Sequence, residues 1–374
     1  MKAIVQDTYG STEVLEYRDV DMPEIADDEV LIRVHAAGVD RGVWHIMTGL
    51  PYPIRLAGYG FRRPKTPVLG MDVAGVVEVV GKDVARFRPG DEVFGIGKGA
   101  FAEYARAPEN KLAAKPANLT FEQAAAVAVS GSPALQAVRD YGRVEPGQKV
   151  LIIGASGGVG TFAVQIAKAF KAEVTAVCSA TKADMVRSLG ADHIIDYRRD
   201  DFAEVRRQYD VILDIGGNSS LSRLRHALTA KGTLVIIGGE TGGRWLGGND
   251  RQIRALLLSP FVGQKLRTLM PKENHRDMTA LKELVEAGKI TPVIDRTYPL
   301  REAPTAIRYL QDGNARGKVV LVVLGDVAVL QPTTSAGAVE DAGCAAHGIE
   351  QVTPATPMPA PPGTKRSAQV PSRP

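Results

Sequence analysis

A pattern typical of a buried strand runs directly into a cluster of glycines near the middle of the chain. Val150–Ile153 are consecutive apolar residues, the turn at 154–160 holds four glycines, and apolar residues then recur at helical spacing through 162–170. This order predicts a dinucleotide-binding unit, because glycines let a pyrophosphate approach the backbone and a helix N-terminus offers free N–H groups. The predicted contacts in the turn are Ser156, Gly157, Gly158, Val159 and Gly160. An ordinary structural turn is the alternative.

Strand and helix patterns alternate from residue 149 onward, which predicts a parallel, doubly wound sheet of the α/β class. The predicted strands are 150–153, 173–178, 193–196, 209–214 and 232–238, with helices near 158–170 and 182–189. Because ligands bind at the carboxyl ends of such strands, Gly216 and Gly238 are expected to flank the cofactor. Plain strand-to-helix turns are the alternative for both.

The first 125 residues have the short strands and Gly/Pro turns of a barrel or sandwich. Strands are predicted at 29–36, 73–81, 91–94 and 100–105, and a helix is predicted to start at Thr120 and run through 121–127. Late in the chain the pattern predicts a helix from 278 to 288, a strand at 293–298, a helix at 303–310 and a last strand at 318–323.

Composition limits the classes of function. A net charge of +4 over 374 residues gives no reason to expect nucleic acid or an anionic membrane as a partner. The two cysteines form no disulfide framework, which fits a reducing, cytoplasmic location. No apolar run is long enough for a transmembrane helix, and the N-terminus does not resemble a signal peptide. Residues 326–374 hold eight of the 23 prolines and no periodic apolar pattern, so 325–374 is predicted to be a disordered tail.

Several short motifs follow one another in an order that resembles the medium-chain dehydrogenase/reductase superfamily, specifically its zinc-free quinone oxidoreductase branch. They are Gly90-Asp91-Glu92-Val93, the glycine turn, Leu189-Gly190-Ala191-Asp192 and the closing segment Arg316–Leu321. The resemblance covers about residues 1–324. It implies a Rossmann NADP-binding domain (126–289) inserted into a GroES-like β-barrel substrate domain (1–125 and 290–324), and a possible homodimer joined through edge strands of the Rossmann sheets.

The same resemblance identifies where zinc-dependent relatives keep their metal ligands. Asp40 stands in place of the first cysteine and Met71 in place of the histidine, and no cysteine precedes Cys178. His35 and His45 remain, but a zinc site needs several such ligands. We therefore expect no metal, and zinc-assisted alcohol oxidation is disfavoured.

The end of the second predicted strand favours NADPH over NADH. No Asp or Glu occurs between Cys178 and Asp184, so the acid that would bind the ribose of NAD is missing. Ser179, Thr181 and Lys182 can instead bind a 2′-phosphate. Tyr197 matches a family tyrosine at the adenosine-phosphate end. The alternative, compatible with this role, is that Ser179 and Thr181 cap the next helix.

A reduced nicotinamide without a metal suits hydride delivery to a quinone or an α,β-unsaturated carbonyl, in which the substrate itself accepts the electrons. Candidates for hydrogen bonding the substrate are Asp40, His45, Tyr52 and Tyr59, without a choice among them. Trp44 and Phe61 can pack on a flat substrate, although core packing is favoured, and 62–65 is expected to be a solvated basic loop. The alternatives are an alcohol dehydrogenase and an NADPH-binding regulatory protein without turnover.

Overall fold

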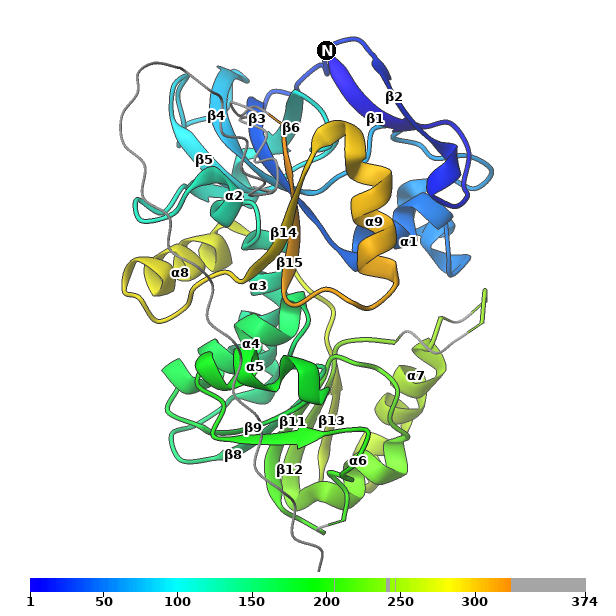
Figure 1. Ribbon diagram of the computed structural model, residues 1–374, viewed down its shortest axis with the longest axis vertical. Coiled ribbons are helices and arrows are strands. Elements are labelled where there is room, and N and C mark those ends of the chain that lie inside the picture. The colour runs from blue at the N-terminus through cyan, green and yellow to red at the C-terminus, as the bar shows by residue number, and fades with distance from the viewer. Residues whose placement is uncertain (205, 240–242, 246, 324–374) are drawn as a thin grey trace, which may run out of the picture. The chain divides into compact units, whose positions relative to one another are not determined.

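The computed structural model describes residues 1–204, 206–239, 243–245 and 247–323 (Figure 1). The predicted tail at 325–374 lies outside the described residues. Within the described part of the chain, no helix is both long and apolar enough to cross a membrane.

A six-stranded parallel sheet forms the second half of the described chain, in the order β10-β9-β8-β11-β12-β13. Its strands are β8 (Lys149–Ile153), β9 (Glu173–Cys178), β10 (His193–Asp196), β11 (Tyr209–Asp214), β12 (Leu228–Ile236) and β13 (Lys265–Thr268). Its helices are α3 (Ala128–Gln136), α4 (Gly158–Ala169), α5 (Ala183–Ser188), α6 (Leu221–Ala227) and α7 (Asn249–Leu258), with short helical turns at Ala137–Gly142, Ala180–Lys182 and Ser259–Phe261. This strand order confirms the predicted doubly wound sheet.

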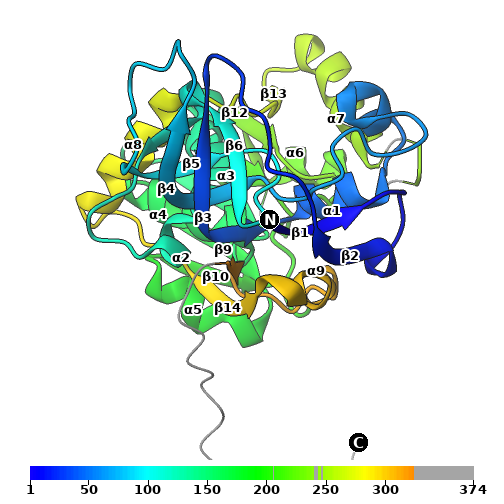
Figure 2. The ribbon, with the colours of Figure 1, turned by 90° about the horizontal axis from the view of Figure 1, so that it is seen from above.

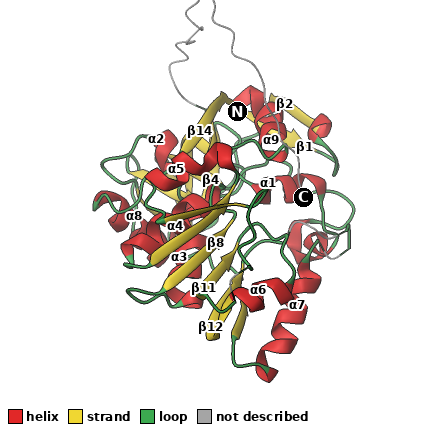
Figure 3. Cartoon of the chain, turned by 60° about the horizontal axis from the view of Figure 1, so that its bottom comes forward, coloured by secondary structure: helices red, strands yellow, loops and turns green. Residues whose placement is uncertain are grey.

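Alternation along β8 explains why helices cover both faces of this sheet. Val150 and Ile152 are fully buried in one hydrophobic cluster, together with Phe162 of α4. Leu151 belongs to a different cluster, which contains residues of α6 and α7 such as Leu224 and Ala255. Successive strand residues point to opposite faces, so an unbroken apolar run needs a helix layer on each side. Figure 3 shows β8, β11 and β12 side by side, with α6 and α7 away from α3 and α4.

A second, mainly antiparallel sheet is built from both ends of the described chain. Its order is β14-β15-β3-β4-β5-β7, and β6 pairs with β3 (Figure 2). The strands are β3 (Glu29–Val39), β4 (Asp72–Val80), β5 (Glu92–Ile96), β6 (Tyr104–Pro108), β7 (Leu112–Ala114), β14 (Ile294–Pro299) and β15 (Lys318–Val322), and β1 (Lys2–Gln6) pairs separately with β2 (Leu15–Asp19). Because β15 pairs with β3, the end of the described chain returns to the sheet formed by its first part.

The remaining helices connect or cover this second sheet. They are α1 (Arg41–Thr48), α2 (Phe121–Ala124), α8 (His275–Glu286) and α9 (Ala303–Gln311), with short turns at Thr12–Val14, Arg55–Tyr59, Glu109–Lys111 and Leu300–Glu302. The predicted helix start at Thr120 is confirmed, because the Thr120 hydroxyl accepts from Gln123 N–H while the Gln123 side chain accepts from Thr120 N–H.

Several predicted boundaries are wrong, and two of them have a clear local description. The helix expected over 121–127 ends at Ala124, and α3 begins only at Ala128. The strand expected at 100–105 begins at Tyr104, because the backbone before it bonds elsewhere: Phe101 N–H donates to Leu69, and Phe101 C=O accepts from Ile4. The expectations also omitted α1, α7 and β13.

Candidate cofactor and substrate site

The carboxyl end of β8 opens into a cavity of about 390 Å³, which we call the cofactor cavity. One wall is the glycine turn and the start of α4. Facing it are the end of β3, the start of α1 and the segment that leads into β15. The two walls are joined where Gly317 N–H donates to Ser156 C=O at 2.9 Å. The cavity therefore lies where a parallel sheet of this order binds its ligands.

The glycines of the turn have two different roles. Gly154 has a φ of +86°, and a Cβ on Gly160 would lie 2.2 Å from the Gly154 carbonyl oxygen, so both positions require glycine for the fold. A Cβ on Gly157 would meet nothing closer than 3.7 Å, yet Gly157 lines the cavity and precedes the first turn of α4. Backbone exposed at a helix N-terminus is suited to a pyrophosphate.

The predicted cofactor residues divide into two groups. The residues that line the cofactor cavity are Ser156, Gly157, Gly158, Val159, Lys182 and Gly216. The residues that do not line it are Gly160, Ser179, Thr181, Tyr197 and Gly238. The Ser179 hydroxyl lies 3.2 Å from that of Thr181 and makes no capping hydrogen bond, so the capping interpretation is wrong for Ser179. Tyr197 is 58% exposed beyond the end of β10, beside the Arg198 guanidinium.

Lys182 already has backbone partners across the cavity. Its Nζ donates to the carbonyls of Gly313 at 3.0 Å and Ala315 at 2.8 Å, which ties the end of β9 to the segment before β15. Burial lowers the pKa of Lys182. An ammonium group has three hydrogens, so one remains for a phosphate oxygen.

A buried ion pair lies in the wall of the cofactor cavity that faces the glycine turn, and the sequence analysis did not predict this pair. Lys318 Nζ lies 2.7 Å from Asp72 Oδ2, and the two side chains are 2% and 0% exposed. The other Asp72 oxygen accepts from Val129 N–H at 2.8 Å. Burial raises the pKa of Asp72 to about 6, against the opposing effect of Lys318. The sequence signal that could have revealed the pair is Lys318, a lysine at the start of the otherwise apolar strand β15.

Asp40 also lines the cofactor cavity, from the N-terminus of α1. Its Oδ1 accepts from Val43 N–H at 3.1 Å, which caps the helix. Its Oδ2 is buried and has no hydrogen-bond partner among the described residues. Burial raises the pKa of Asp40, while Lys318 opposes the change.

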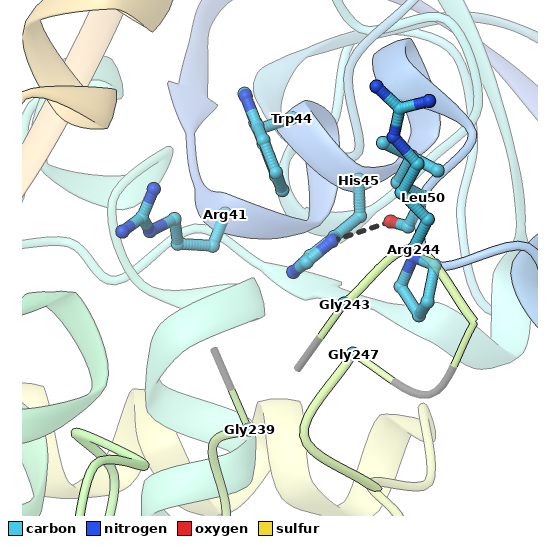
Figure 4. Close-up of a pocket in the computed structure, with 9 residues that line it drawn as sticks. Arg41, Trp44, His45, Leu50, Gly239, Gly243, Arg244 and Gly247 are labelled. Carbon is cyan, nitrogen blue, oxygen red and sulfur yellow. Dashed lines mark hydrogen bonds between the residues drawn. The ribbon is translucent and has the colours of Figure 1, made fainter. Parts of the chain in front are cut away.

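His45 lines a different cavity, of about 300 Å³, between α1 and the segment after β12 (Figure 4). Its Nδ1 lies 2.8 Å from the Leu50 carbonyl oxygen, which can only accept, so Nδ1 donates this hydrogen bond. Arg41 lines both cavities.

Tyr52 lines neither of these two cavities. Its ring lies 5.2 Å from the ring of Trp245. The predicted substrate residues are therefore not gathered in one place.

Arg251 of α7 joins the turns that follow β11 and β12. It forms an ion pair of 2.5 Å with the buried Asp214, and donates to the carbonyls of Ser219 and Gly238. A Cβ on Gly238 would lie 2.0 Å from the Ile215 carbonyl oxygen. Gly238 thus allows a close backbone approach, whereas Gly216 faces the cavity.

Comparison with known proteins agrees with this architecture. A model of the alcohol dehydrogenase GroES-like domain matches residues 26–117, and a model of zinc-binding dehydrogenases matches residues 189–321. The chain is 36% identical over 361 residues to NAD(P)H oxidoreductase RTN4IP1, mitochondrial, of Bos taurus, covering 87% of this chain and 89% of the relative. It is 31% identical over 335 residues to the quinone oxidoreductase of Homo sapiens, covering 86% and 98%.

A solved structure of Escherichia coli quinone oxidoreductase complexed with NADPH has a TM-score of 0.73 and 25% identity, covering 86% of this chain and 100% of that chain. The chain belongs to the medium-chain dehydrogenase/reductase superfamily. Within this superfamily it falls in the quinone oxidoreductase-like branch, and it is an oxidoreductase by family. The predicted combination of a Rossmann sheet with a GroES-like domain is confirmed.

The described residues at the position of the zinc in some members of the superfamily do not form a donor set that suits this metal. Met71 lines a third cavity, of about 420 Å³, and its neutral thioether is not among the thiolate, imidazole and carboxylate groups that bind Zn²⁺ in proteins. The described residues hold no group of three or more His, Cys, Asp or Glu side chains that could bind a metal. His35 instead stacks on Phe121 at 4.1 Å, and burial lowers its pKa.

The aromatic candidates have different environments in the superfamily fold. Trp44 packs against the hydrophobic core of the GroES-like part, which agrees with the favoured interpretation. Phe61 is 69% exposed, so core packing is wrong for this residue. Arg62, Arg63 and Lys65 are exposed, as expected for a solvated loop.

Proposed function

We propose that this protein is an NADPH-dependent reductase that delivers hydride to a quinone or an α,β-unsaturated carbonyl without a metal. One observation carries the proposal: the glycine turn, Asp40 and Lys318 line the same cavity. A cofactor site and buried groups that can handle protons thus adjoin each other. The donor set around Asp40 and Met71 does not suit Zn²⁺, which disfavours the alternative of a zinc-type alcohol dehydrogenase.

The glycine turn would hold the pyrophosphate with the N–H groups at the start of α4, and Gly216 and Asp40 would adjoin the nicotinamide half. When bound, the nicotinamide supplies the hydride. The chain's own residues orient the cofactor and substrate and exclude bulk water. For the 2′-phosphate we propose Lys182 with Ser179, Thr181 and Tyr197, because no acid follows β9 before Asp184. The NADPH in the Escherichia coli structure supports this preference.

A substrate screen with a metal assay tests the proposal. Pure protein is incubated with NADPH and, separately, NADH against panels of quinones, enones and aldehydes, and zinc is measured on the same sample. We expect NADPH oxidation with quinones or enones and far less than one zinc per chain. About one zinc per chain together with alcohol oxidation would favour the alcohol dehydrogenase alternative. Tight NADPH binding without any oxidation would favour the regulatory alternative.

We also propose that the protein forms a homodimer through the edge of its parallel sheet. β13 forms one edge of the described sheet, and large apolar side chains on and beside α7 are exposed. They include Leu256 (53%), Leu257 (68%), Phe261 (85%) and Met270 (74%). A second copy of this chain fits such an edge, because edge strands can pair with each other and bury an apolar patch.

The cytoplasmic location stays a prediction from the cysteine content and the N-terminal sequence. The name of the bovine relative includes the word mitochondrial, and this location is stated for that relative alone. Imaging of the full-length protein carrying a C-terminal fluorescent tag would test the location.

A further inference from the structure

Three charged side chains lie buried together in one wall of the cofactor cavity. They are Asp40, Asp72 and Lys318, each at most 9% exposed. One buried ammonium group thus lies near two carboxyl groups, and of these Asp72 is the one in contact with it. Ionising both would leave an uncompensated buried negative charge, which is costly in a low dielectric. Burial therefore raises the pKa of both carboxyl groups, which favours a proton on one of them.

The hydrogen bonds indicate which carboxyl group carries that proton. Asp72 is the better anion, because Oδ2 contacts Lys318 Nζ at 2.7 Å and Oδ1 accepts from Val129 N–H at 2.8 Å. Asp40 Oδ1 accepts from Val43 N–H at 3.1 Å, and the N–H groups of Val43 and Gly42 both lower the pKa of Asp40. Asp40 Oδ2 is buried and has no hydrogen-bond partner among the described residues. This suits a protonated oxygen, whose O–H group can donate to an acceptor on the substrate.

The other charged groups near Asp40 come from three elements. Lys318 of β15 and His45 of α1 favour its ionised form. Asp72 of β4 disfavours it, since each of the two carboxylates raises the pKa of the other. Tyr59 interacts with Asp40 electrostatically and is neutral near pH 7, because burial raises its pKa. Burial has the largest effect on the pKa of Asp40 and raises it.

We propose that Asp40 donates the proton that completes reduction of the substrate, and that its burial beside Asp72 keeps it protonated for this role, against the opposing effect of Lys318. This inference rests on the proposed function. The hydride would come from a C–H bond of the reduced nicotinamide, which breaks, and would form a C–H or O–H bond on the substrate and leave an anionic product. The O–H bond of Asp40 then breaks, and its proton binds to that anion. The Asp40 carboxylate takes a proton from water before the next turnover.

The Asp40→Asn variant tests the donor. Asn has the same shape, and it caps a helix as well as Asp does, so α1 should still form. We expect NADPH oxidation to fall about 100-fold, in the range of a lost general acid, and the solvent deuterium isotope effect on turnover to change. A wild-type rate with an unchanged isotope effect would overturn the proposal. Asp19→Asn, on the exposed strand β2, is the matched control for the substitution.

Substitutions of Asp72 and Lys318 should shift the pH dependence of activity in opposite directions, which a loss of packing would not do. Activity should decline as pH rises and Asp40 loses its proton. Asp72→Asn removes a negative charge and should move that decline to lower pH, whereas Lys318→Met removes a positive charge and should move it to higher pH. Shifts in the same direction, or no shift in either variant, would contradict the proposal.

Infrared spectroscopy separates this inference from the proposed function, since it requires no turnover. The wild-type protein at pH 7 should show a buried protonated carboxyl band that is absent in Asp40→Asn and in no other single Asp variant of the cavity. If the protein reduces no quinone or enone but shows this band, the proposed function fails and the assignment of the proton stands. If the band is missing, or disappears only in Asp72→Asn, the proton is not on Asp40.

Discussion

Lys318 Nζ lies 2.7 Å from Asp72 Oδ2, which joins two residues that are 246 positions apart in the chain. The pair connects β15 to β4 across the intervening strand β3. Breaking such a buried pair by removing one partner costs about 3–5 kcal/mol, because the other charge is left uncompensated. The ion pair therefore helps to fix the return of the chain to its first sheet, directly beneath the cofactor cavity.

Asp72 should make stability fall as the pH rises. Its pKa is raised to about 6 in the folded protein from a usual value of 3.8, so the folded state binds more protons than the unfolded state between these values. The stabilising effect is present below pH 4 and is lost as pH rises through 6, by about 3 kcal/mol at most. Relative to Asp72→Asn, the free energy of unfolding of the wild type should decline between pH 4.5 and 7, measured by urea denaturation.

Asp19→Asn is the control for this pH dependence. Lys2 lowers the pKa of Asp19, so any stability from Asp19 is lost as pH falls. The opposite slopes distinguish burial of Asp72 from a general effect of removing a carboxylate. A parallel pH dependence for wild type and Asp72→Asn would contradict the assigned pKa.

Two glycines of the turn should respond differently to alanine. Gly160→Ala places a Cβ 2.2 Å from the Gly154 carbonyl oxygen and should destabilise the fold by about 1–3 kcal/mol. Gly157→Ala meets no close atom, so the melting temperature should hardly change. The added methyl group faces the cavity, and NADPH affinity should fall about tenfold or more, or about 1.4 kcal/mol. Thermal melting and NADPH fluorescence titration measure both effects, and equal melting temperatures would refute the distinction.

Lys182→Ala should weaken the binding of NADPH far more than that of NADH. A hydrogen bond from a charged group is worth about 1.5–3 kcal/mol, which corresponds to about 10- to 100-fold in affinity. The loss of the bonds to Gly313 and Ala315 affects both cofactors equally, so the ratio of the two dissociation constants isolates the phosphate contact. Lys168→Ala, whose lysine pairs with Asp192, is the control. Equal effects on the two cofactors would reject the 2′-phosphate role.

The apolar patch at α7 should mediate dimer formation. We expect the wild-type protein to sediment as a dimer and the double variant Leu257→Glu/Phe261→Glu as a monomer, because two charges would be buried in the contact. Analytical ultracentrifugation over a range of concentrations measures the change. Tyr17→Glu, at an exposed position on β2, is a control that should remain dimeric. A monomeric wild type would refute the proposed homodimer.

Local sequence patterns determined most of the parallel sheet and the glycine turn. Val150–Ile153 reads as a strand buried on both faces, and the capping box at Thr120 needs only neighbouring residues. By contrast, β13 is only four residues long, its place at the sheet edge depends on pairing with β12, and α7 packs against β13. The boundary at Tyr104 was missed because Phe101 bonds to residues distant in sequence.

The features of the candidate site also divide into those that depend on adjacent residues and those that depend on the tertiary structure. The sequence by itself determined that a glycine turn precedes a helix and that no acid lies between Cys178 and Asp184, since both depend on adjacent residues. Only the tertiary structure decided that Asp40 and Lys318 share a cavity with that turn while His45 faces another. Long-range pairing of β15 with β3 brings these side chains together, and burial then sets their charges. Neither the pairing nor the burial is encoded in any short stretch of sequence.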